Sequence, residues 1–205
     1  MTELKEVYIK NSRLPLRLRE EKLDLKPSTT NDLNSFKRLK AIKDNIKLFV
    51  DKHQNLLISS ENVGNGKTTW SAKIIRAYID DYAQNYSFIN NTPVLFINVP
   101  QFLMKKKLAI NNSDELAEIE EIERCIFSSD IVVFDDIATK TASDYDKELL
   151  YVYINYRTDN FLTSIYTTNV SKTDLEKELG ERLADRIIGY SVCIELDGAS
   201  RREAK

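Results

Sequence analysis

The sequence is poor in the residues that mark disulfide-rich, secreted or membrane-spanning chains. Its 205 residues include two cysteines, five glycines, four prolines and one tryptophan. Cys125 and Cys193 stand far apart with no C-x-x-C pair, which excludes a disulfide framework and a cysteine-based metal site, and we interpret both as core thiols. No run approaches the roughly 18 to 20 apolar residues that a membrane span needs, and residues 1–11 are charged rather than signal-like. We therefore expect a cytoplasmic protein.

An excess of charge of either sign is also absent. The 30 Lys and Arg residues balance 32 Asp and Glu residues, and the formal net charge is −2. The chain as a whole therefore has no electrostatic attraction to nucleic acid, and any DNA binding must come from a local patch. With 42% hydrophobic residues, the chain is long enough for one domain with a core and too short for two ordinary ones.

The first part of the chain differs in pattern from the rest. Residues 1–30 contain two prolines and many charges with little periodicity, which predicts an extended N-terminal arm that packs locally or contacts another molecule. From Asn31, apolar residues recur at helical spacing as far as Phe49, with Asn31 or Asp32 as the N-cap. We expect the folded domain to span 31–205.

Short apolar runs then alternate with amphipathic stretches. Helical spacing is clear in 70–82 and in 116–126, whereas 105–113 interrupts the pattern and predicts a loop or a short broken helix. The runs predicted as strands are 56–59, 94–99, 131–134, 164–167 and 192–196. This rhythm predicts an α/β fold, with a central parallel sheet that has helices on both faces.

A phosphate-binding loop follows the first predicted strand directly, where residues 61–69 read E-N-V-G-N-G-K-T-T before a helix begins. Such a loop needs small residues that let backbone N–H groups face the phosphates, a helix N-terminus, a lysine for the β and γ oxygens, and a hydroxyl for Mg²⁺. The sequence therefore predicts ATP and Mg²⁺ as ligands. The residues predicted to bind ATP in this loop are Val63, Gly64, Asn65, Gly66, Lys67, Thr68 and Thr69, with Thr68 also on the metal.

Glu61 occupies the first position of this loop, where glycine is usual. A carboxylate near a triphosphate has an electrostatic cost. Because the residue lies at the exit of the strand rather than against the phosphates, we expect only a modest effect on the loop.

Two carboxylates end the third predicted strand, which reads I-V-V-F-D-D over 131–136. A buried parallel strand beside the loop would deliver Asp135 to the Mg²⁺ shell and leave Asp136 to polarise the attacking water. Adjacent like charges are unfavourable unless a cation compensates, which favours this reading over a solvated turn.

Further polar residues follow the fourth predicted strand. Asn169 can bond the γ-phosphate or hold the water, or it is a turn residue before Ser171, a predicted N-cap. Arg182 and Arg186 lie four apart on a predicted helix, and like charges at this spacing suggest a nearby anion. Glu178 lies four residues before Arg182 and is its candidate ion-pair partner on the helix. Arg186 has a less obvious partner, and we interpret Arg186 as an arginine finger.

Two more arginines, Arg201 and Arg202, follow the last predicted strand. Either would reach the γ-phosphate of the same chain, or both belong to a charged tail. Their spacing alone does not decide between these readings.

These residues together resemble the AAA+ ATPases of the bacterial DnaC/DnaI-type helicase loaders and the related IstB-type transposition ATPases, over about residues 30 to 203. The resemblance implies a three-layer αβα sandwich with little or no C-terminal lid domain. It also implies Asn169 as sensor one, Arg186 as a finger on a neighbouring subunit's ATP, and Arg202 as sensor two, with Arg201 as the fallback. The matching pieces are 63–69, 132–136, 153–157, 166–169 and 179–186, of which the last, L-G-E-R-L-A-D-R, is the most discriminating.

The resemblance also implies partners. In such loaders the insertion after the second strand contacts single-stranded DNA inside a spiral of subunits, which here maps to 102–112. Phe102 would offer a stacking ring, and Lys105, Lys106 and Lys107 would bind phosphates, unless the segment is a solvated basic loop. Residues 3–26 are the candidate grip on a replicative helicase.

The leading hypothesis is a helicase loader, of a build that would suit a phage, that assembles as a homo-oligomer on single-stranded DNA. An IstB-like helper of transposition that binds duplex DNA is the alternative. A small-molecule P-loop kinase is a third reading. It would need a substrate lid and an acceptor site, and neither is recognisable in this sequence. A nucleotide-binding structural protein with impaired turnover would explain Glu61.

Overall fold

Five parallel strands form the centre of the structure, a computed structural model that describes residues 2–19, 25–85, 92–110, 112–138, 142–198 and 200. The order across the sheet is β2-β3-β4-β1-β5, and every pairing is parallel. The strands are β1 (Asn55–Ser59), β2 (Val94–Asn98), β3 (Ile131–Asp135), β4 (Thr163–Thr168) and β5 (Ser191–Glu195). All five predicted strands are confirmed, with boundaries that differ by one residue at most.

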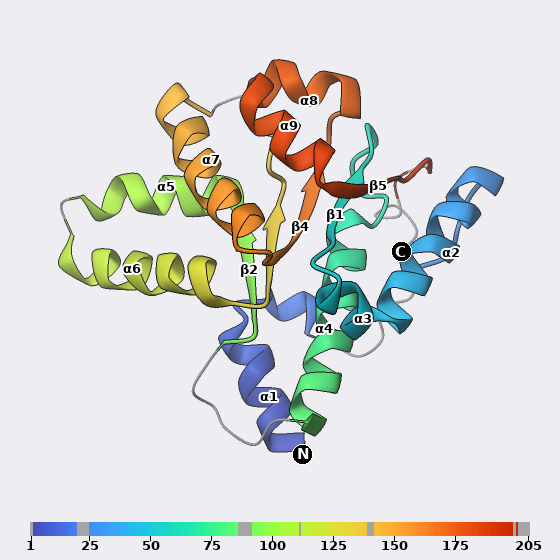
Figure 1. Cartoon of the computed structure of the whole chain (residues 1–205), viewed down its shortest axis with the longest axis horizontal. Coiled ribbons are helices and arrows are strands. Elements are labelled where there is room, and N and C mark those ends of the chain that lie inside the picture. The colour runs from blue at the N-terminus through green and yellow to red at the C-terminus, as the bar shows by residue number, and fades with distance from the viewer. Residues whose placement is uncertain are drawn as a thin grey trace.

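Helices cover both faces of this sheet (Figure 1). Alternate residues of each strand enter two separate cores: Leu56 and Ile58 point into one, and Leu57 points into the other. The first core is covered by α1 (Thr2–Asn11), α2 (Thr30–Asp44), α3 (Ile46–Asp51) and α4 (Lys67–Asn85). The second is covered by α5 (Val99–Ala109), α6 (Ser113–Ser128), α7 (Asp144–Asp159), α8 (Lys172–Leu179) and α9 (Glu181–Gly189). The predicted three-layer αβα sandwich is confirmed.

The N-terminal segment contains helix α1, so the predicted extended conformation is wrong for residues 2–11, whereas the predicted local packing is confirmed for the described residues. Helix α1 packs beside α4, and Tyr8, Leu14 and Leu18 are at most 2% exposed in the same core as β1. A 3₁₀ turn, η1 (Leu16–Leu18), follows. The apolar side chains of this segment are too widely spaced to show a clear period, yet they fill the core beside α4.

Helix α2 covers the outer edge of β5. Its N-cap is Thr29, whose hydroxyl accepts from the backbone of Asp32, so the predicted N-cap at Asn31 or Asp32 is wrong by two or three residues. Side chains from this region donate to three alternate carbonyls along the outward edge of β5 and just beyond its end: Arg38 to Cys193 at 3.3 Å, Ser35 to Glu195 at 2.5 Å and Thr29 to Asp197 at 2.9 Å. The unpaired acceptors of an edge strand are thereby used within the chain.

Arg157 on α7 holds the two strands that carry the acidic and amide residues of the sequence motifs. Its side chain is fully buried, and its guanidinium donates to the carbonyls of Ile126, Ser129 and Thr163 at 2.6, 3.0 and 2.5 Å. These carbonyls lie just before β3 and at the start of β4, so one side chain fixes the beginnings of both strands.

Two predicted elements differ in detail. Residues 105–109 belong to the regular helix α5, and the chain breaks only after it, before α6. The helix predicted to carry Arg182 and Arg186 has Leu179, Leu183 and Ile187 at helical spacing, but these three residues are divided between α8 and α9, because Gly180 has a φ of +85° and ends the first helix. All three side chains are still buried in one core.

Both cysteines are free and half-buried against the second core, as interior thiols would be. Over the described residues, no helix combines the length and the apolar character that crossing a membrane requires.

Candidate functional site

The loop between β1 and α4 has the backbone that its glycines allow. Gly64 and Gly66 have φ values of +83° and +103°, a region that side chains with a Cβ rarely adopt. The carbonyl of Gly66 accepts from Trp70 N at 2.8 Å, so helix α4 begins at the loop and its first N–H groups face outward. Glu61 is exposed and does not line the adjoining cavity, as expected for a residue at the strand exit. The loop is a ready site for an anion.

Lys67 bends back over this loop. The side chain is 6% exposed, and Nζ donates to Asn62 O at 3.1 Å and to Ser60 O and Asn65 Oδ1 at 3.4 Å. Asn65 is itself fully buried and donates to Leu196 O at 3.2 Å. Two backbone carbonyls and one amide oxygen thus hold the ammonium group in the mouth of the loop.

The two carboxylates differ in environment. Asp135, at the end of β3, is 5% exposed, and burial raises its pKa above the ordinary value. Hydrogen bonds from Thr167, Thr68 and Asn98 oppose that rise, and the neighbouring charge of Asp136 adds to it. The Thr167 hydroxyl donates to Asp135 Oδ1 at 2.7 Å. A buried, negatively charged oxygen thus faces the hydroxyl of the loop.

Asp136 is turned away from the strand by a left-handed backbone, with φ of +59°. Its N–H donates to the Thr167 hydroxyl at 2.9 Å, and its Oδ1 accepts from Asn169 Nδ2 at 2.5 Å. The hydroxyl of Thr167 is therefore bonded to both acidic residues, and Asn169 positions the second carboxylate.

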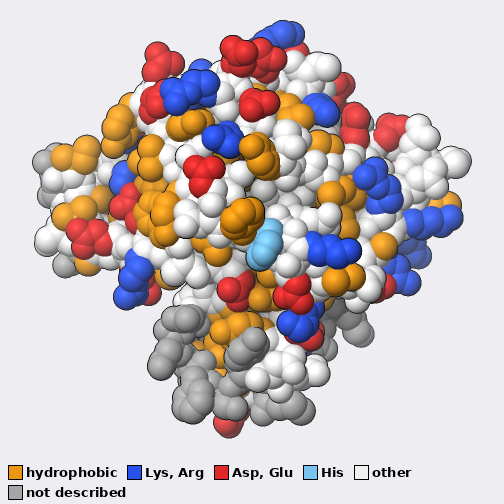
Figure 2. Space-filling view, in the orientation of Figure 1, with side chains coloured by type: hydrophobic (Ala, Val, Ile, Leu, Met, Phe, Trp, Pro, Cys, Tyr) orange, Lys and Arg blue, Asp and Glu red, His pale blue; other side chains and the backbone are white. Residues whose placement is uncertain are grey.

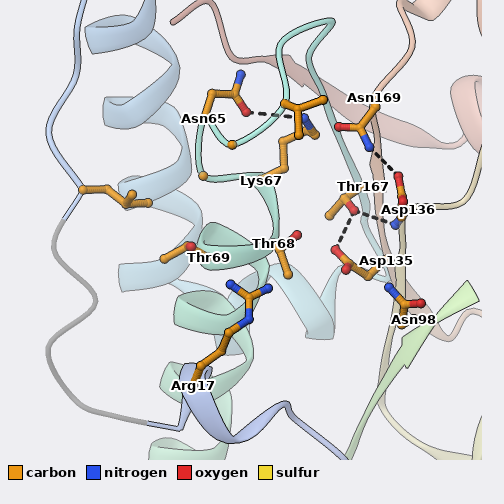
Figure 3. Close-up of a pocket in the computed structure, with 14 residues that line it drawn as sticks. Arg17, Asn65, Lys67, Thr68, Thr69, Asn98, Asp135, Asp136, Thr167 and Asn169 are labelled. Carbon is orange, nitrogen blue, oxygen red and sulfur yellow. Dashed lines mark hydrogen bonds between the residues drawn. The ribbon is translucent and has the colours of Figure 1, made fainter. Parts of the chain in front are cut away.

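These groups surround one cavity of about 380 Å³ at the carboxyl edge of the sheet (Figure 3). The loop residues predicted to bind ATP, both predicted acidic residues and Asn169 all line it. Residues that the sequence did not indicate line it too, and two of them come from the N-terminal segment. These additional residues are Arg17, Leu25, Asn98 and Thr167.

Thr68 and Asp135 fit a divalent cation. The hydroxyl and the carboxylate are in contact, and the buried charge of Asp135 beside Asp136 is of the kind that a cation stabilises. Groups of three or more His, Cys, Asp or Glu side chains placed to hold a metal are absent from the described part of the chain. A cation here would need further ligands from a bound phosphate, which is how Mg²⁺ is commonly held.

Arg186 does not line the cavity of its own chain. It lies on α9, where its guanidinium contacts the hydroxyl of Tyr190 at 3.2 Å and Asp159 at 3.8 Å. Arg182 contacts Glu148 at 3.9 Å and stacks on Tyr151, rather than pairing with Glu178, because the helix breaks at Gly180. Arg201 and Arg202 lie outside the residues that the structure describes.

The predicted DNA-binding group is placed differently from the prediction. Phe102 is 5% exposed and packs against Tyr153, so its ring is not available to stack on a base, and that prediction is wrong. The apolar ring fills the space between α5 and α7. The three lysines each face a carboxylate: Lys105 with Glu118, Lys106 with Glu123 and Lys107 with Asp146. On the face shown in Figure 2, basic and acidic side chains are mixed over this part of the molecule.

Curated proteins similar in sequence to this chain include replicative helicase loaders named DnaC. The replicative helicase loader DnaC of Escherichia coli K12 is 26% identical over 146 residues, which cover 71% of this chain and 55% of the relative. DnaC of Buchnera aphidicola from Acyrthosiphon pisum is 23% identical over 120 residues, which cover 58% of this chain and 48% of the relative. The chain spans about half the length of the curated relatives it matches. No protein-family model matches it.

Solved structures show the same fold. The crystal structure of the DnaC helicase loader has a TM-score of 0.69 at 19% identity and covers 89% of this chain and all of that one. That of DnaI has a TM-score of 0.65 at 18% identity, covering 88% of this chain and 92% of that one. AMPPCP-bound DnaA from Aquifex aeolicus has a TM-score of 0.63 at 16% identity, covering 92% and 53%. The chain thus shares the αβα fold of the DnaC and DnaI structures and resembles the DnaC replicative helicase loaders in sequence.

Proposed function

We propose that this protein is an ATPase of DNA replication that binds Mg-ATP in the cavity beside α4 and loads or remodels a replicative helicase on single-stranded DNA. One observation carries the proposal. A chain similar in sequence to DnaC brings Lys67, Asp135, Asp136 and Asn169 together around one cavity at the carboxyl edge of its sheet.

Nucleotide binding rests on the loop. The backbone N–H groups at the start of α4 cradle the α- and β-phosphates, and Lys67 turns from the carbonyls of Ser60 and Asn62 toward the β- and γ-phosphates. Thr68 and Asp135 would hold Mg²⁺, which when bound would supply positive charge to the phosphate oxygens. The structural similarity to DnaA with bound AMPPCP, an ATP analogue, supports a triphosphate as the ligand.

We assign hydrolysis to Asp136 and to Asn169, which donates a hydrogen bond to it. Asp136 orients the attacking water and accepts its proton, while Asn169 Nδ2, 2.5 Å from Asp136 Oδ1, keeps that carboxylate aligned and approaches the γ-phosphate. The phosphoryl group passes from the β-γ bridging oxygen to the water oxygen, which leaves ADP and inorganic phosphate.

Turnover needs a second copy of the chain. Arg186 is absent from the lining of its own cavity, and its side chain is 27% exposed at the surface of α9. We assign it to the site of a neighbouring subunit, where an arginine finger would stabilise charge on the transferred phosphoryl group. Homo-oligomers that form when nucleotide and DNA bind would then assemble complete sites.

Contact with DNA and helicase is proposed for two surfaces. Lys105 and Lys107 are half-exposed on α5, and a DNA phosphate there would compete with the carboxylates of Glu118 and Asp146. The N-terminal region 3–26 is the candidate contact with the helicase, although its apolar side chains in 2–19 serve the core.

The test is the ATPase rate and the sedimentation of the purified protein with single-stranded DNA, duplex DNA or a replicative helicase, beside an Asp136→Ala control. We expect stimulation and assembly on single strands, strengthened by helicase, and no turnover in the control. Filaments that prefer duplex DNA would point instead to a transposition helper. No response to any partner, or equal turnover in the control, would contradict the proposal.

A further inference from the structure

We infer that Arg17, from the N-terminal segment, is a ligand of the nucleotide's phosphates on the side of α4 away from Lys67. The assignment rests on the proposed nucleotide site and names a residue that no part of the loop motif indicates. It begins with the position of the side chain. Arg17 lines the cavity, and its guanidinium points toward Thr68 and Thr69 at the start of α4 (Figure 3).

The backbone beneath Arg17 is fixed by the core. Leu14 and Leu18, on either side in sequence, are 0% and 2% exposed. The carbonyl of Ser12 accepts from Phe96 N of strand β2 at 2.7 Å, and Arg19 Nε donates to Leu14 O at 2.7 Å. The 3₁₀ turn is therefore anchored to the edge of the sheet, and it holds Arg17 beside α4 whether or not a ligand is present.

The guanidinium itself has no protein partner in the part of the chain that the structure describes. Arg17 is exposed, and no hydrogen bond or ion pair joins it to another described residue. It faces the amino end of a helix, which carries partial positive charge and repels a cation. A cation held in this position becomes favourable when an anion lies between it and the helix.

The charged residues that line the cavity also favour a phosphate as the group that Arg17 contacts. Among the described residues that line it, the cations are Arg17 and Lys67, and the anions are Asp135 and Asp136. Without Arg17 this set would carry a net negative charge, although its ligand, Mg-ATP, is also negative. Arg17 brings the set to neutrality and so removes a repulsion.

The position also decides which phosphates are contacted. Lys67 and Asn169 serve the γ-phosphate end of the cavity, whereas the N–H groups beside Thr68 and Thr69 cradle the α- and β-phosphates. Arg17 faces these two threonines, so it contacts oxygens that ATP and ADP share. Its loss should weaken both nucleotides by the same factor.

Leu25 also places the N-terminal segment beside the site. It follows residues 20–24, which lie outside the described residues. A Cβ added to Gly66 would meet the Leu25 side chain at 3.0 Å, so this leucine packs directly on the phosphate loop. The N-terminal segment thus meets the site at two points, one apolar and one cationic. Bound nucleotide would tie that segment to the loop.

The experiment is calorimetric titration of Mg-ATP and Mg-ADP into wild type, Arg17→Ala, Arg17→Lys and the matched control Arg124→Ala. Arg124 is an exposed arginine on α6 that does not line the cavity, so its loss changes net charge equally. We expect Arg17→Ala to weaken both nucleotides about tenfold, the lower range for a hydrogen bond to a charged group, and Arg17→Lys to weaken them less. The melting temperature without nucleotide should not change in any variant.

Equal affinity in wild type and Arg17→Ala would overturn the inference, as would a loss confined to ATP or an equal loss in Arg124→Ala. Each of these results leaves the nucleotide site itself in place. Failure of the wild-type chain to bind either nucleotide would instead overturn the proposed function on which the inference rests.

Discussion

Replacing Asp135 with asparagine should stabilise the nucleotide-free protein while removing its response to Mg-ATP. The wild-type carboxylate is 5% exposed, and burial raises its pKa, so its negative charge destabilises the folded chain at neutral pH. In the wild type the Thr167 hydroxyl donates to Asp135 Oδ1 at 2.7 Å. Asparagine removes the charge and keeps an oxygen that accepts this hydrogen bond. The structure therefore predicts opposite effects on stability and on binding.

The expected gain is about 1 kcal/mol, within the range of about 0.5 to 2 kcal/mol that single stabilising substitutions commonly give. For a chain of this size, 1 kcal/mol raises the melting temperature by about 2 to 4 °C. Wild type should in turn gain about 2.7 kcal/mol from Mg-ATP at 100 times its dissociation constant, whereas Asp135→Asn should gain little.

The sign of the pH dependence follows from the direction of the pKa shift. Since the pKa is higher in the folded chain, the carboxyl group of Asp135 contributes full stability below its ordinary value of 3.8 and loses that contribution as pH rises through the raised value. Asparagine does not titrate. The advantage of Asp135→Asn should therefore grow as pH rises and vanish toward about pH 4.

Thermal and urea unfolding of both proteins, with and without Mg-ATP, at several pH values would measure this. Asp136→Asn is the matched control, because its carboxylate lies next in sequence but is less buried. A lower melting temperature for Asp135→Asn at neutral pH, or a difference that does not change with pH, would refute the reasoning from burial.

Three further substitutions test separate parts of the structure. Lys67→Met should weaken ATP binding at least about 100-fold in a titration, since it removes a charged group that bonds the phosphates, and unchanged affinity would contradict its role. Arg186→Ala should leave ATP affinity nearly intact but abolish the rise of specific ATPase rate with protein concentration; a loss of binding would instead indicate a role within its own chain. Leu14→Ala should lower the free energy of unfolding by about 2 to 5 kcal/mol in urea, because a fully buried side chain is removed from the core; a change below 1 kcal/mol would show that the N-terminal segment is dispensable for the fold.

The sheet and most of the cavity were predictable because their signals are local. Each strand is a short apolar run between polar turns, and parallel strands place their carboxyl ends at one edge. The sequence alone therefore assigns 63–69 and the pair Asp135 and Asp136 to one site. The spacing of charged and small residues was sufficient.

The residues that the sequence did not indicate depend on contacts distant in sequence. Arg17 precedes Thr68 by a long stretch of chain, and only the packing of α1 and η1 against α4 brings it to the cavity. Thr167 is one of several threonines, and its role follows from bonds to both acidic residues. The prediction that Phe102 stacks on DNA was wrong because the local sequence does not show which way the ring points. An aromatic residue beside lysines gives the same pattern in an exposed loop and in a helix whose aromatic side chain packs inward.

The covering of both sheet edges limits how copies of this protein can associate. An open strand edge is a template on which another chain can add a strand, which leads to aggregation. Here the side chains of Ser35 and Arg38 donate to outward carbonyls of β5, Thr29 donates to the carbonyl of Asp197 just beyond it, and the carbonyl of Ser12 accepts from Phe96 N on β2. Subunits that gather on DNA, as the proposed function requires, would therefore meet through side chains rather than by extending one sheet, and contacts of that kind could be made and released as nucleotide binds and leaves.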